Sequence, residues 1–342
     1  MHDEVLARCR AALPGWRELT VADVEFDAPK GFSSFTMGVR PLVAVDPPAV
    51  LYRHLAGKEN AILDAAAERD VFLLLGEHHI AAHCYHADDV CRIEEFYTGR
   101  TLTADDLTDH EVLGKIADQL YRFHQIEPGG LPAPTFFELL HARWGPMARS
   151  VLDDRRDEFP ADERALCDDL TEMLADRTLS MVLRCLPDPV ERPPVFCHND
   201  TYHGNVMLLT DGSIRLLDFE FSCRNHVAFD FANLFAETVM VHGLADPPHF
   251  TIGDPAYTDD DIGALVGAYL DNAGFATSAA RAAEHRTLVD QTRRAIMLSD
   301  YMYAMAALPL ALQPIQKIRF LPYAHRRFHR FLDSWQREFG NH

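Results

Sequence analysis

The sequence predicts an α+β fold in two lobes, an antiparallel β-sheet lobe over residues 1–95 and a mostly helical lobe over 96–342. Three observations support this prediction. A chain of 342 residues is too long for one small core. Short runs with β character are concentrated before residue 95. Beyond that point apolar residues recur at helical spacing, as in 110–124.

The first lobe is predicted to start with a helix over 3–13, which ends at Pro14-Gly15. A strand over 19–26 follows, then a loop of small residues that includes Ser33 and Ser34. A second strand resumes at 35–39. A strand, a small-residue loop and a strand form the arrangement of a loop that covers a nucleotide. We therefore assign Ser33 and Ser34 to nucleotide binding.

The next predicted strand, 50–53, places Arg53 where it would contact nucleotide phosphates. Glu59 begins a helical segment over 59–69, and we predict that it pairs with Arg53, as a strand lysine and a helix glutamate do in protein kinases. The alternative is a solvated arginine and a glutamate favoured by the helix dipole. After a further strand, the link that holds Glu95 and Tyr97 is predicted to meet the adenine through its backbone.

Residues 195–220 carry the clearest chemical pattern in the chain. A short apolar run leads into a loop that holds Asp200 and that Asn205 closes. Asp211-Gly212 then separates two β runs, which is a strong hairpin signal. The two runs are 206–209 and 214–217. A hairpin here would return the chain, so that Asp218 arrives beside Asp200 and Asn205.

These residue types suit phosphoryl transfer. Magnesium prefers carboxylate and amide oxygens, which Asp218 and Asn205 supply, and Asp200 can accept the proton of an acceptor hydroxyl. A protein-kinase signature has the same order of a loop Asp, an Asn and a later Asp-Phe-Gly, with Glu220 here in place of the glycine. The sequence thus predicts catalysis by Asp200, Asn205 and Asp218, with ATP or GTP and Mg²⁺ as cofactors.

The second lobe is predicted to consist mainly of helices. His124 ends the helix over 110–124 in a structural role, and Asp230 stands where the N-cap of a helix belongs. Residues 240–260, rich in Pro and His, are predicted to form a long irregular loop that borders the acceptor site. Further helices are expected over 136–186, 259–272, 278–307 and 320–338.

The composition restricts the partners. A formal net charge of −20 argues against nucleic acid or an anionic membrane surface and suits a small cationic substrate. No apolar run is long enough to span a bilayer, and the start of the chain lacks a secretion signal, so a cytoplasmic protein is expected. The seven cysteines have irregular spacings, which indicates free thiols. A homodimer is left open, because the sequence does not decide the oligomeric state.

The chain resembles the choline/ethanolamine kinase family, a branch of the protein-kinase-like phosphotransferases that also includes the aminoglycoside phosphotransferases. The resemblance implies a bilobal protein-kinase-like fold, Asp200 as base, Asn205 and Asp218 as magnesium ligands, Glu220 near the metal or the ammonium group, and Glu237 near the acceptor. The carrying residues are Val195-Phe-Cys-His-Asn-Asp200, Gly204-Asn205, Leu217-Asp-Phe-Glu-Phe221, Asn225, Phe229-Asp230 and Asn233-Leu-Phe-Ala-Glu237.

The resemblance also implies an aromatic cage for the ammonium group. Phe221, Tyr303 and Tyr323 fall where cage residues are expected, and we assign Tyr202 to the acceptor site as well. His242 and Ala306 stand where the family usually has Tyr or Trp. We therefore expect a hydroxylated, amine-bearing acceptor, with choline a weaker substrate than a primary amine or a larger amino compound.

Three other functions are weighed against this one. A related kinase that phosphorylates an antibiotic would need the same catalytic residues and differ only in its acceptor pocket. A catalytically inactive kinase-like binding module is disfavoured by the intact Asp200, Asn205 and Asp218. A hydrolase could instead use His198, His203 and the two aspartates as a transition-metal site, but this leaves Asn205 without a role.

Overall fold

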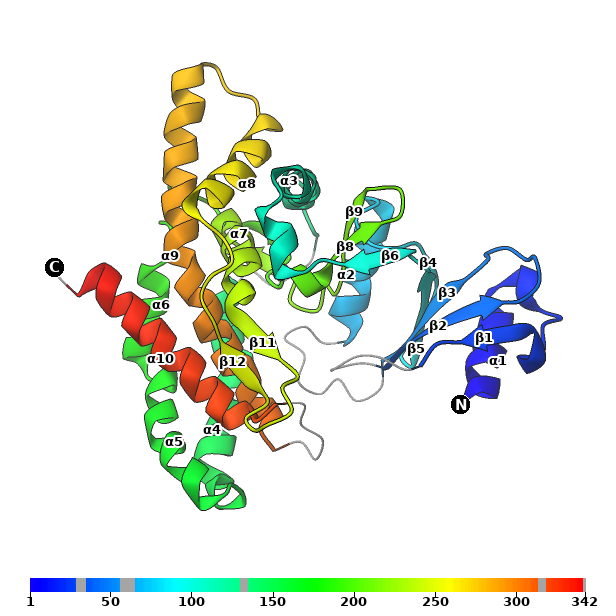
Figure 1. Cartoon of the computed structure of the whole chain (residues 1–342), viewed down its shortest axis with the longest axis horizontal. Helices are drawn as coiled ribbons and strands as arrows, with labels where there is room; N and C mark the ends of the chain where they lie inside the picture. The colour runs from blue at the N-terminus through cyan, green and yellow to red at the C-terminus, as the bar shows by residue number, and fades with distance from the viewer. Residues whose placement is uncertain (29–34, 56–64, 130–134, 313–317, 341–342) are drawn as a thin grey trace. The chain divides into compact units, whose positions relative to one another are not determined.

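A computed structural model describes residues 1–28, 35–55, 65–129, 135–312 and 318–340. The chain divides into two compact units (Figure 1). The first consists of Met1–Arg100 with Leu208–Glu220, and the second of Thr101–Met207 with Phe221–His342. The observed boundary is thus at Arg100, where the sequence suggested 95, and the segment Leu208–Glu220 groups with the first unit.

The first unit contains a five-stranded antiparallel sheet in the order β1-β2-β3-β5-β4. Its strands are β1 (Val24–Phe26), β2 (Phe35–Pro41), β3 (Val50–His54), β4 (Cys84–Ala87) and β5 (Cys91–Glu95). The strand predicted over 19–26 is shorter than expected. A capping box between Thr20 and Asp23 turns Val21–Asp23 into a 3₁₀ turn before β1 begins.

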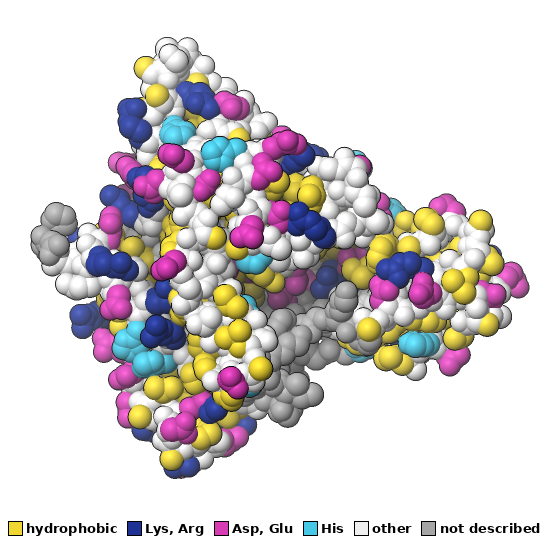
Figure 2. Space-filling model, viewed as in Figure 1, with side chains coloured by type: hydrophobic (Ala, Val, Ile, Leu, Met, Phe, Trp, Pro, Cys, Tyr) yellow, Lys and Arg dark blue, Asp and Glu magenta, His cyan; other side chains and the backbone are white. Residues whose placement is uncertain are grey.

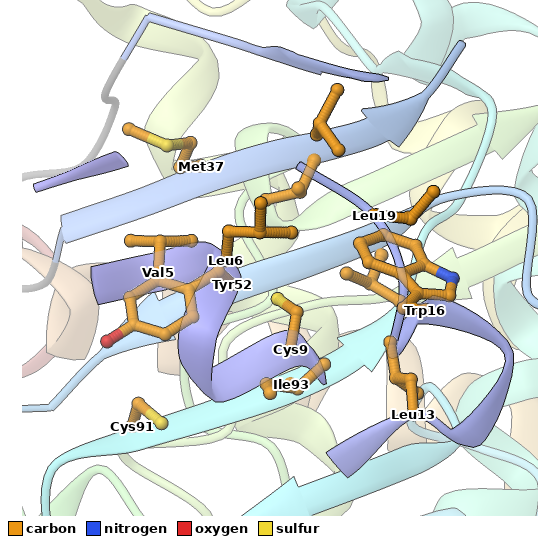
Figure 3. Packing of buried hydrophobic residues seen from close by; sticks show 13 residues of the cluster. Val5, Leu6, Cys9, Leu13, Trp16, Leu19, Met37, Tyr52, Cys91 and Ile93 are labelled. Carbon is orange, nitrogen blue, oxygen red and sulfur yellow. The ribbon is translucent and has the colours of Figure 1, made fainter. Parts of the chain in front are cut away.

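The helix α1 (His2–Ala12) covers one face of this sheet (Figure 3). Val5, Leu6 and Cys9 lie on the apolar face of α1 and pack with buried strand residues such as Met37, Tyr52 and Ile93. At about 25 cal/mol per Å² of apolar surface removed from water, such contacts hold the helix on the sheet. Trp16, fully buried, donates its indole N–H to the carbonyl of Pro47.

The helix α2 (Ala65–Glu77) was predicted over 59–69, so the predicted C-terminus is wrong. Val71, Phe72 and Leu75 are buried at helical spacing, which extends the helix beyond Arg69. Residues 56–64, with Glu59, and residues 29–34, with Ser33 and Ser34, lie outside the described residues.

The predicted hairpin after the loop is confirmed. The strands β6 (Gly99–Thr101), β8 (Val206–Leu209) and β9 (Ile214–Leu216) form a sheet in that order. Gly212 has φ 81°, a left-handed conformation that glycine adopts without strain. Its N–H donates to the carbonyl of Leu209, and Asp211 accepts from the N–H of Ser213. This turn closes β8 onto β9.

The second unit is mainly helical, as predicted. Its helices are α3 (His110–His124), α4 (Phe136–Arg149), α5 (Ala161–Thr171), α6 (Asp176–Arg184), α7 (Val227–Ala236), α8 (Asp259–Asp271), α9 (Ser278–Leu310) and α10 (Phe320–Phe339). The long helix α9 packs against α7, α10, α4 and α8 and forms the centre of the unit. Asp109 caps α3, which has the predicted bounds. Short 3₁₀ or π turns of this unit occupy Ala104–Thr108, Ser150–Asp154, Arg156–Glu158, Glu172–Leu174, His203–Asn205 and Glu237–Val239. A further 3₁₀ turn, Pro14–Trp16, belongs to the first unit.

Two small antiparallel sheets complete the second unit. The strand β7 (Val195–Cys197) pairs with β10 (Cys223–Asn225), and β11 (Met240–His242) pairs with β12 (Phe250–Ile252). The prediction of an irregular loop over 240–260 is therefore wrong in part. The strand β11 buries Met240 and exposes both Val241 and His242, so it has no apolar alternation that the sequence could have revealed.

No helix in the described ranges combines the length and the apolar character needed to cross a membrane. Acidic and basic side chains are interspersed over the surface of the helical unit (Figure 2).

Candidate active site

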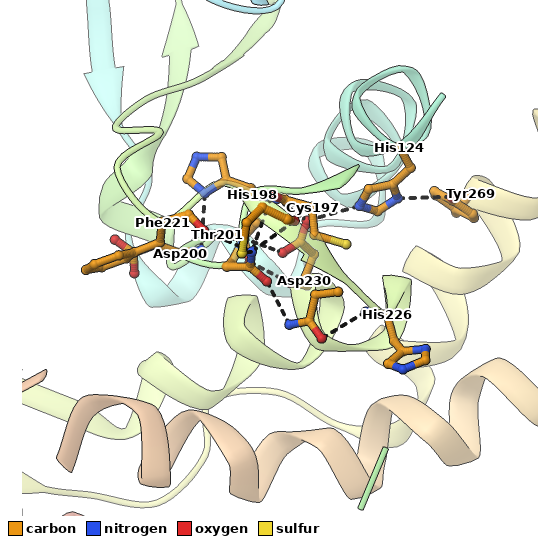
Figure 4. A network of polar contacts seen from close by, with 12 residues as sticks. His124, Cys197, His198, Asp200, Thr201, Phe221, His226, Asp230 and Tyr269 are labelled. Atoms are coloured by element: carbon orange, nitrogen blue, oxygen red, sulfur yellow. Dashed lines mark hydrogen bonds and ion pairs between the residues drawn. The ribbon is translucent and has the colours of Figure 1, made fainter. Parts of the chain in front are cut away.

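The loop after β7 is fixed by the side chain of Asn199, which has φ 66°. Asparagine tolerates this left-handed conformation better than most residues. Its amide nitrogen donates to the carbonyl of Phe221 at 2.9 Å, and its amide oxygen accepts from the Asn225 amide at 2.7 Å (Figure 4). These bonds join the loop to the segment around β10.

Asp230 holds the same loop from the side of α7. Its carboxylate accepts from the backbone N–H groups of His198 at 2.8 Å and Asn199 at 2.7 Å. It also lies 3.0 Å from Nε2 of His124, whose Nδ1 is 3.0 Å from the hydroxyl of Tyr269 (Figure 4). The prediction that Asp230 is an N-cap is wrong, because its donors belong to the loop and the N-cap position of α7 falls on His226. The structural role predicted for His124 agrees with these contacts.

Asp200 lies at the end of this loop, 7% exposed. Tyr303 on α9 donates its hydroxyl to Oδ1 of Asp200 at 2.6 Å, and the Asn205 amide donates to Oδ2 at 2.8 Å and to the Asp200 carbonyl at 3.0 Å. Burial raises the pKa of Tyr303 well above its ordinary value, so the phenol stays protonated and acts as a donor. The carboxylate is therefore oriented by a phenol and an amide.

The residues predicted to hold a metal have suitable donor atoms. Because the Asn205 nitrogen is used in the bonds to Asp200, the amide oxygen is the atom left to coordinate a cation. Asp218, at φ 62°, has a side chain 28% exposed and lies 3.9 Å from Nη1 of Arg53. Carboxylate and amide oxygens fit Mg²⁺. Asn205 belongs to the second unit and Asp218 to the first. The contact of Asn205 with Asp200 and that of Asp218 with Arg53 each lie within one unit.

In the first unit the partners of Arg53 within the described residues include Glu94 and Asp218. Its Nε lies 3.3 Å from Oε1 of Glu94, which also accepts from Nε of Arg92 at 2.6 Å. Arg92 in turn lies 3.7 Å from Glu68 on α2. The pairing of β3 with β5 sets Arg53 opposite Arg92, so both guanidinium groups share one carboxylate. Glu59 lies outside the described residues.

Sequence analysis missed Glu94 and Glu68. A signal was present in β5, where Arg92 and Glu94 alternate with buried Cys91 and Ile93 and must share one face. Burial raises the pKa of Glu94, but Arg92 and Arg53 outweigh that effect and hold the pKa below its ordinary value. The buried Arg92 and the largely buried Arg53 thus favour the ionised form of this glutamate.

The other predicted nucleotide residues have modest contacts. Glu95 is exposed at the end of β5 and accepts weakly from the N–H of His83 at 3.4 Å. The guanidinium of Arg215 lies 5.8 Å from the ring centre of Tyr97. Burial raises the pKa of Tyr97 to about 12. Burial lowers the pKa of Arg53, but Glu94 and Asp218 outweigh it and raise the pKa, with a smaller contribution from Glu220.

The predicted cage residues Tyr303 and Tyr323 lie around an internal cation. The guanidinium of Arg327, fully buried, is 4.8 Å from the ring centre of Tyr303 and 5.5 Å from that of Tyr323. Arg327 pairs with Glu237 and, at 3.1 Å, with Asp300. Burial raises the pKa of Glu237, an effect that Arg327 partly offsets. Glu237, predicted to face the acceptor, is therefore bound by Arg327.

The hairpin of β11 and β12 adds an aromatic residue that was not predicted. The ring centre of Tyr323 lies 5.2 Å from that of Phe250 and 6.0 Å from that of His242. Nothing in the Pro- and His-rich sequence around Phe250 distinguished it from an ordinary buried residue. Phe221 instead packs edge-on against Trp144, with ring centres 5.5 Å apart. The ring of Tyr202 packs against Gly204. A Cβ atom on residue 204 would lie 2.4 Å from that ring, so this contact requires glycine.

Comparison with known proteins shows which family the chain is related to. The family model for choline/ethanolamine kinase matches residues 35–332. The chain belongs to the choline/ethanolamine kinase family. Among curated members, it is 29% identical to a choline/ethanolamine kinase of Mus musculus over 61% of this chain and 52% of that protein. It is 37% identical to a probable choline kinase of Arabidopsis thaliana over 46% of this chain and 41% of that protein. The match thus spans about half the length of these family members.

Solved structures show the fold. A choline kinase from Cryptosporidium parvum superposes with a TM-score of 0.78 at 19% identity, over 100% of this chain and 97% of that chain. An ADP-bound aminoglycoside phosphotransferase superposes with a TM-score of 0.59 at 10% identity, over 98% of this chain and 99% of that chain. The predicted bilobal kinase-like fold, with an N-terminal antiparallel sheet and a mostly helical remainder, is confirmed.

Proposed function

We propose that this protein transfers the terminal phosphoryl group of a nucleoside triphosphate to the hydroxyl of a small, positively charged amino alcohol. The observation that carries the proposal is the Asp200 carboxylate, which Tyr303 and Asn205 orient through its two oxygens. A kinase of this type needs a carboxylate fixed in position to receive the proton of the acceptor hydroxyl. Membership in the choline/ethanolamine kinase family supports this reaction and this class of acceptor.

Asp200 can accept the proton while keeping both hydrogen bonds. Each carboxylate oxygen has two acceptor positions, and the bonds from Tyr303 and Asn205 use one on each oxygen. A carboxylate thus has the acceptor capacity to bind a hydroxyl in addition to these two donors. Because the two donors are neutral at physiological pH, they orient the carboxylate without adding a positive charge of their own.

The nucleotide would be bound by groups of the first unit together with the metal ligands. Asn205, Asp218 and Glu220 would hold Mg²⁺, which when bound neutralises charge on the transferred phosphoryl group. Arg53 would contact the phosphates, since Glu94 fixes it at the end of β3. Glu59, Ser33, Ser34, Glu95 and Tyr97 remain predicted nucleotide contacts. The proposed reaction requires the groups of both units.

The acceptor's amine would bind near the aromatic residues on α9, α10 and the β11–β12 hairpin. Tyr303 connects these rings to the base, because its hydroxyl binds Asp200 directly. Arg327 already faces Tyr303 and Tyr323, and Glu237 is neutralised by it, so the acceptor's charge must be balanced by other groups. Glu220, the other glutamate that we assign to the acceptor, is a candidate for that role. Phe250 adds an aromatic surface at Tyr323.

The proposal is tested by a substrate matrix with the full chain. ATP and GTP are each combined with Mg²⁺ and with ethanolamine, choline, a longer amino alcohol or an aminoglycoside, and the phosphorylated product is identified by ³¹P NMR. Transfer to an amino alcohol supports the proposal, and transfer to the aminoglycoside alone would replace it with antibiotic modification. Absence of any transfer above that of the Asp200→Asn variant would overturn it.

A further inference from the structure

A group of histidine side chains lies on the surface where α10 packs against α5 (Figures 1 and 2). His325 and His329 are four residues apart on α10, so one helical turn places both on the same face. Asp169 reaches this face from the last turn of α5. None of these three residues is among the candidate active-site residues. The helix α10 also carries Tyr323 and Arg327, but each stands two residues before His325 or His329 and so lies on a different face of the helix.

The three side chains direct ligand atoms toward one point. Oδ2 of Asp169 lies 3.1 Å from Nε2 of His325 and 3.8 Å from Nε2 of His329. All three ligand atoms are within 4.8 Å of one another. A tetrahedral ion with bonds of about 2.0–2.2 Å holds its ligand atoms roughly 3.3 Å apart. Small side-chain rotations would bring this set onto a single ion.

His329 gives a second and independent indication. Its Nε2 is buried, yet it has no hydrogen-bond partner within the described part of the chain. A buried ring nitrogen without a partner is unfavourable, because it has lost its bonds to water. An ion shared with Asp169 and His325 would use this nitrogen. The three side chains are 59%, 24% and 45% exposed for Asp169, His325 and His329, so water can complete the coordination.

Two other groups of possible ligands, found among the described residues, are already committed to other bonds. Asp230 in the group with His124 and Cys197 accepts two backbone N–H groups of the catalytic loop.

In the group of His86, Asp88 and Cys91, the Asp88 carboxylate binds Arg8 at 3.0 Å and the backbone N–H groups of Val90 and Cys91. The arginine supplies the positive charge that a metal would otherwise bring. Neither group has the combination found at α5 and α10 of accessible ligands and a buried ring nitrogen without a hydrogen bond.

We propose that Asp169, His325 and His329 form a binding site for a divalent transition-metal ion of the zinc class, which links α10 to α5. Two imidazoles and one carboxylate suit zinc or cobalt and do not suit magnesium, which selects oxygen ligands. The ion would be held by two helices that are far apart in sequence and would stabilise their packing. The site is independent of the proposed kinase reaction.

The test uses the untagged full chain, freed of metal with a chelator and then titrated with Co²⁺ in the absence of nucleotide. We expect one equivalent to bind with the visible absorption of a four-coordinate nitrogen and oxygen site, and Zn²⁺ to displace it. His325→Ala and His329→Ala should each weaken binding by about 10²-fold or more, since even loss of a group behind a direct ligand costs 10–100-fold. Circular dichroism checks that the variants are folded.

His110→Ala is the matched control. His110 is an exposed histidine with a carboxylate partner, Asp261 at 3.0 Å, on the same unit, and it should bind Co²⁺ as the unaltered protein does. Equal affinity in the two α10 variants and the unaltered protein would overturn the proposal. So would an intense near-ultraviolet band from cobalt–thiolate bonds, which would place the ion on a cysteine, or full competition by Mg²⁺.

Discussion

The two units surround a buried carboxylate with different kinds of hydrogen-bond donor. In the first unit Glu94 lies between two guanidinium groups, those of Arg53 and Arg92. In the second unit Asp200 receives its hydrogen bonds from a phenol and an amide, those of Tyr303 and Asn205. The first arrangement balances charge, and the second orients a charged group through neutral donors.

This difference bears on what each carboxylate can do. Two cations stabilise the ionised form of Glu94 and lower its pKa, which makes it a weak proton acceptor and a firm anchor for Arg53. Tyr303 and Asn205 orient Asp200 without adding positive charge of their own, which suits a base that, in this proposal, serves a positively charged acceptor. The buried pair of Glu237 and Arg327 in the second unit also balances charge, but there burial outweighs the arginine and the pKa of Glu237 is raised.

The largest effect is expected from Asp200→Asn. The substitution keeps the shape of the side chain but removes the charge and the proton acceptor, so turnover should fall about 10²- to 10⁴-fold. Steady-state kinetics with saturating nucleotide and amino alcohol measures the loss, and urea unfolding should show little change in stability. Turnover close to that of the unaltered protein would remove Asp200 from the mechanism.

Asp230→Asn provides the contrast within the same loop. Asp230 accepts two backbone N–H groups and contacts His124, all within a fully buried environment. Its replacement should therefore lower the free energy of unfolding as well as activity. Equal stability of Asp200→Asn and Asp230→Asn would contradict the separate roles given to these residues.

Glu94→Gln tests the charge-balanced cluster of the first unit. The substitution removes the shortest described carboxylate contact of each arginine and leaves the longer ones to Glu68 and Asp218, so the variant should lose about 3–5 kcal/mol of unfolding free energy. Urea unfolding at pH 7 measures this loss. Glu95→Gln is the matched control, because the neighbouring side chain is exposed at the end of β5 and should change stability little.

The pH dependence of the same variant has a definite sign. Because the folded pKa of Glu94 is below its ordinary value of 4.5, its contribution is full above that value and is lost as pH falls through the folded pKa. The difference in stability between the unaltered protein and Glu94→Gln should therefore be constant near neutrality and shrink below about pH 4. A difference that grows on acidification would contradict the assigned direction.

The contrast between these clusters also explains what could be predicted from the sequence. Asp200 and Asn205 belong to one local pattern, and the Asp211-Gly212 turn sets the hairpin that follows them, so both were predicted. The strand that carries Arg53 was predicted from its local pattern, but the partner Glu94 comes from a strand paired across the sheet. Nothing local identifies such a partner. For the same reason Asp230 was taken for an N-cap, since its donors lie about thirty residues earlier in the chain.

Tyr303→Phe is expected to have an intermediate effect, because it removes the phenol that orients Asp200 and keeps the ring. Hydrogen bonds to charged groups contribute roughly 1.5–3 kcal/mol, so turnover should fall about 10- to 100-fold. Tyr301→Phe is the matched control on the same helix, since its hydroxyl binds His141 at 2.8 Å and not Asp200. If both variants retain full turnover, the neutral-donor interpretation of Asp200 is wrong.

The smallest effect is expected from Ala306→Trp, which should change the preference between a quaternary and a primary amine in the acceptor. Ala306 follows Tyr303 by three residues on α9, so a large ring there would lie beside Tyr303. Because Arg327 already faces Tyr303 and Tyr323, an added indole face should benefit a quaternary ammonium most. Cation–π contact of about 0.5–2 kcal/mol predicts that Ala306→Trp raises kcat/KM for choline relative to ethanolamine about 2- to 30-fold. Ala306→Leu fills much of the same space without a π face and should leave the ratio unchanged. If both variants raise this kcat/KM ratio equally, the preference depends on side-chain volume. If Ala306→Trp lowers the ratio, the ammonium group binds away from α9.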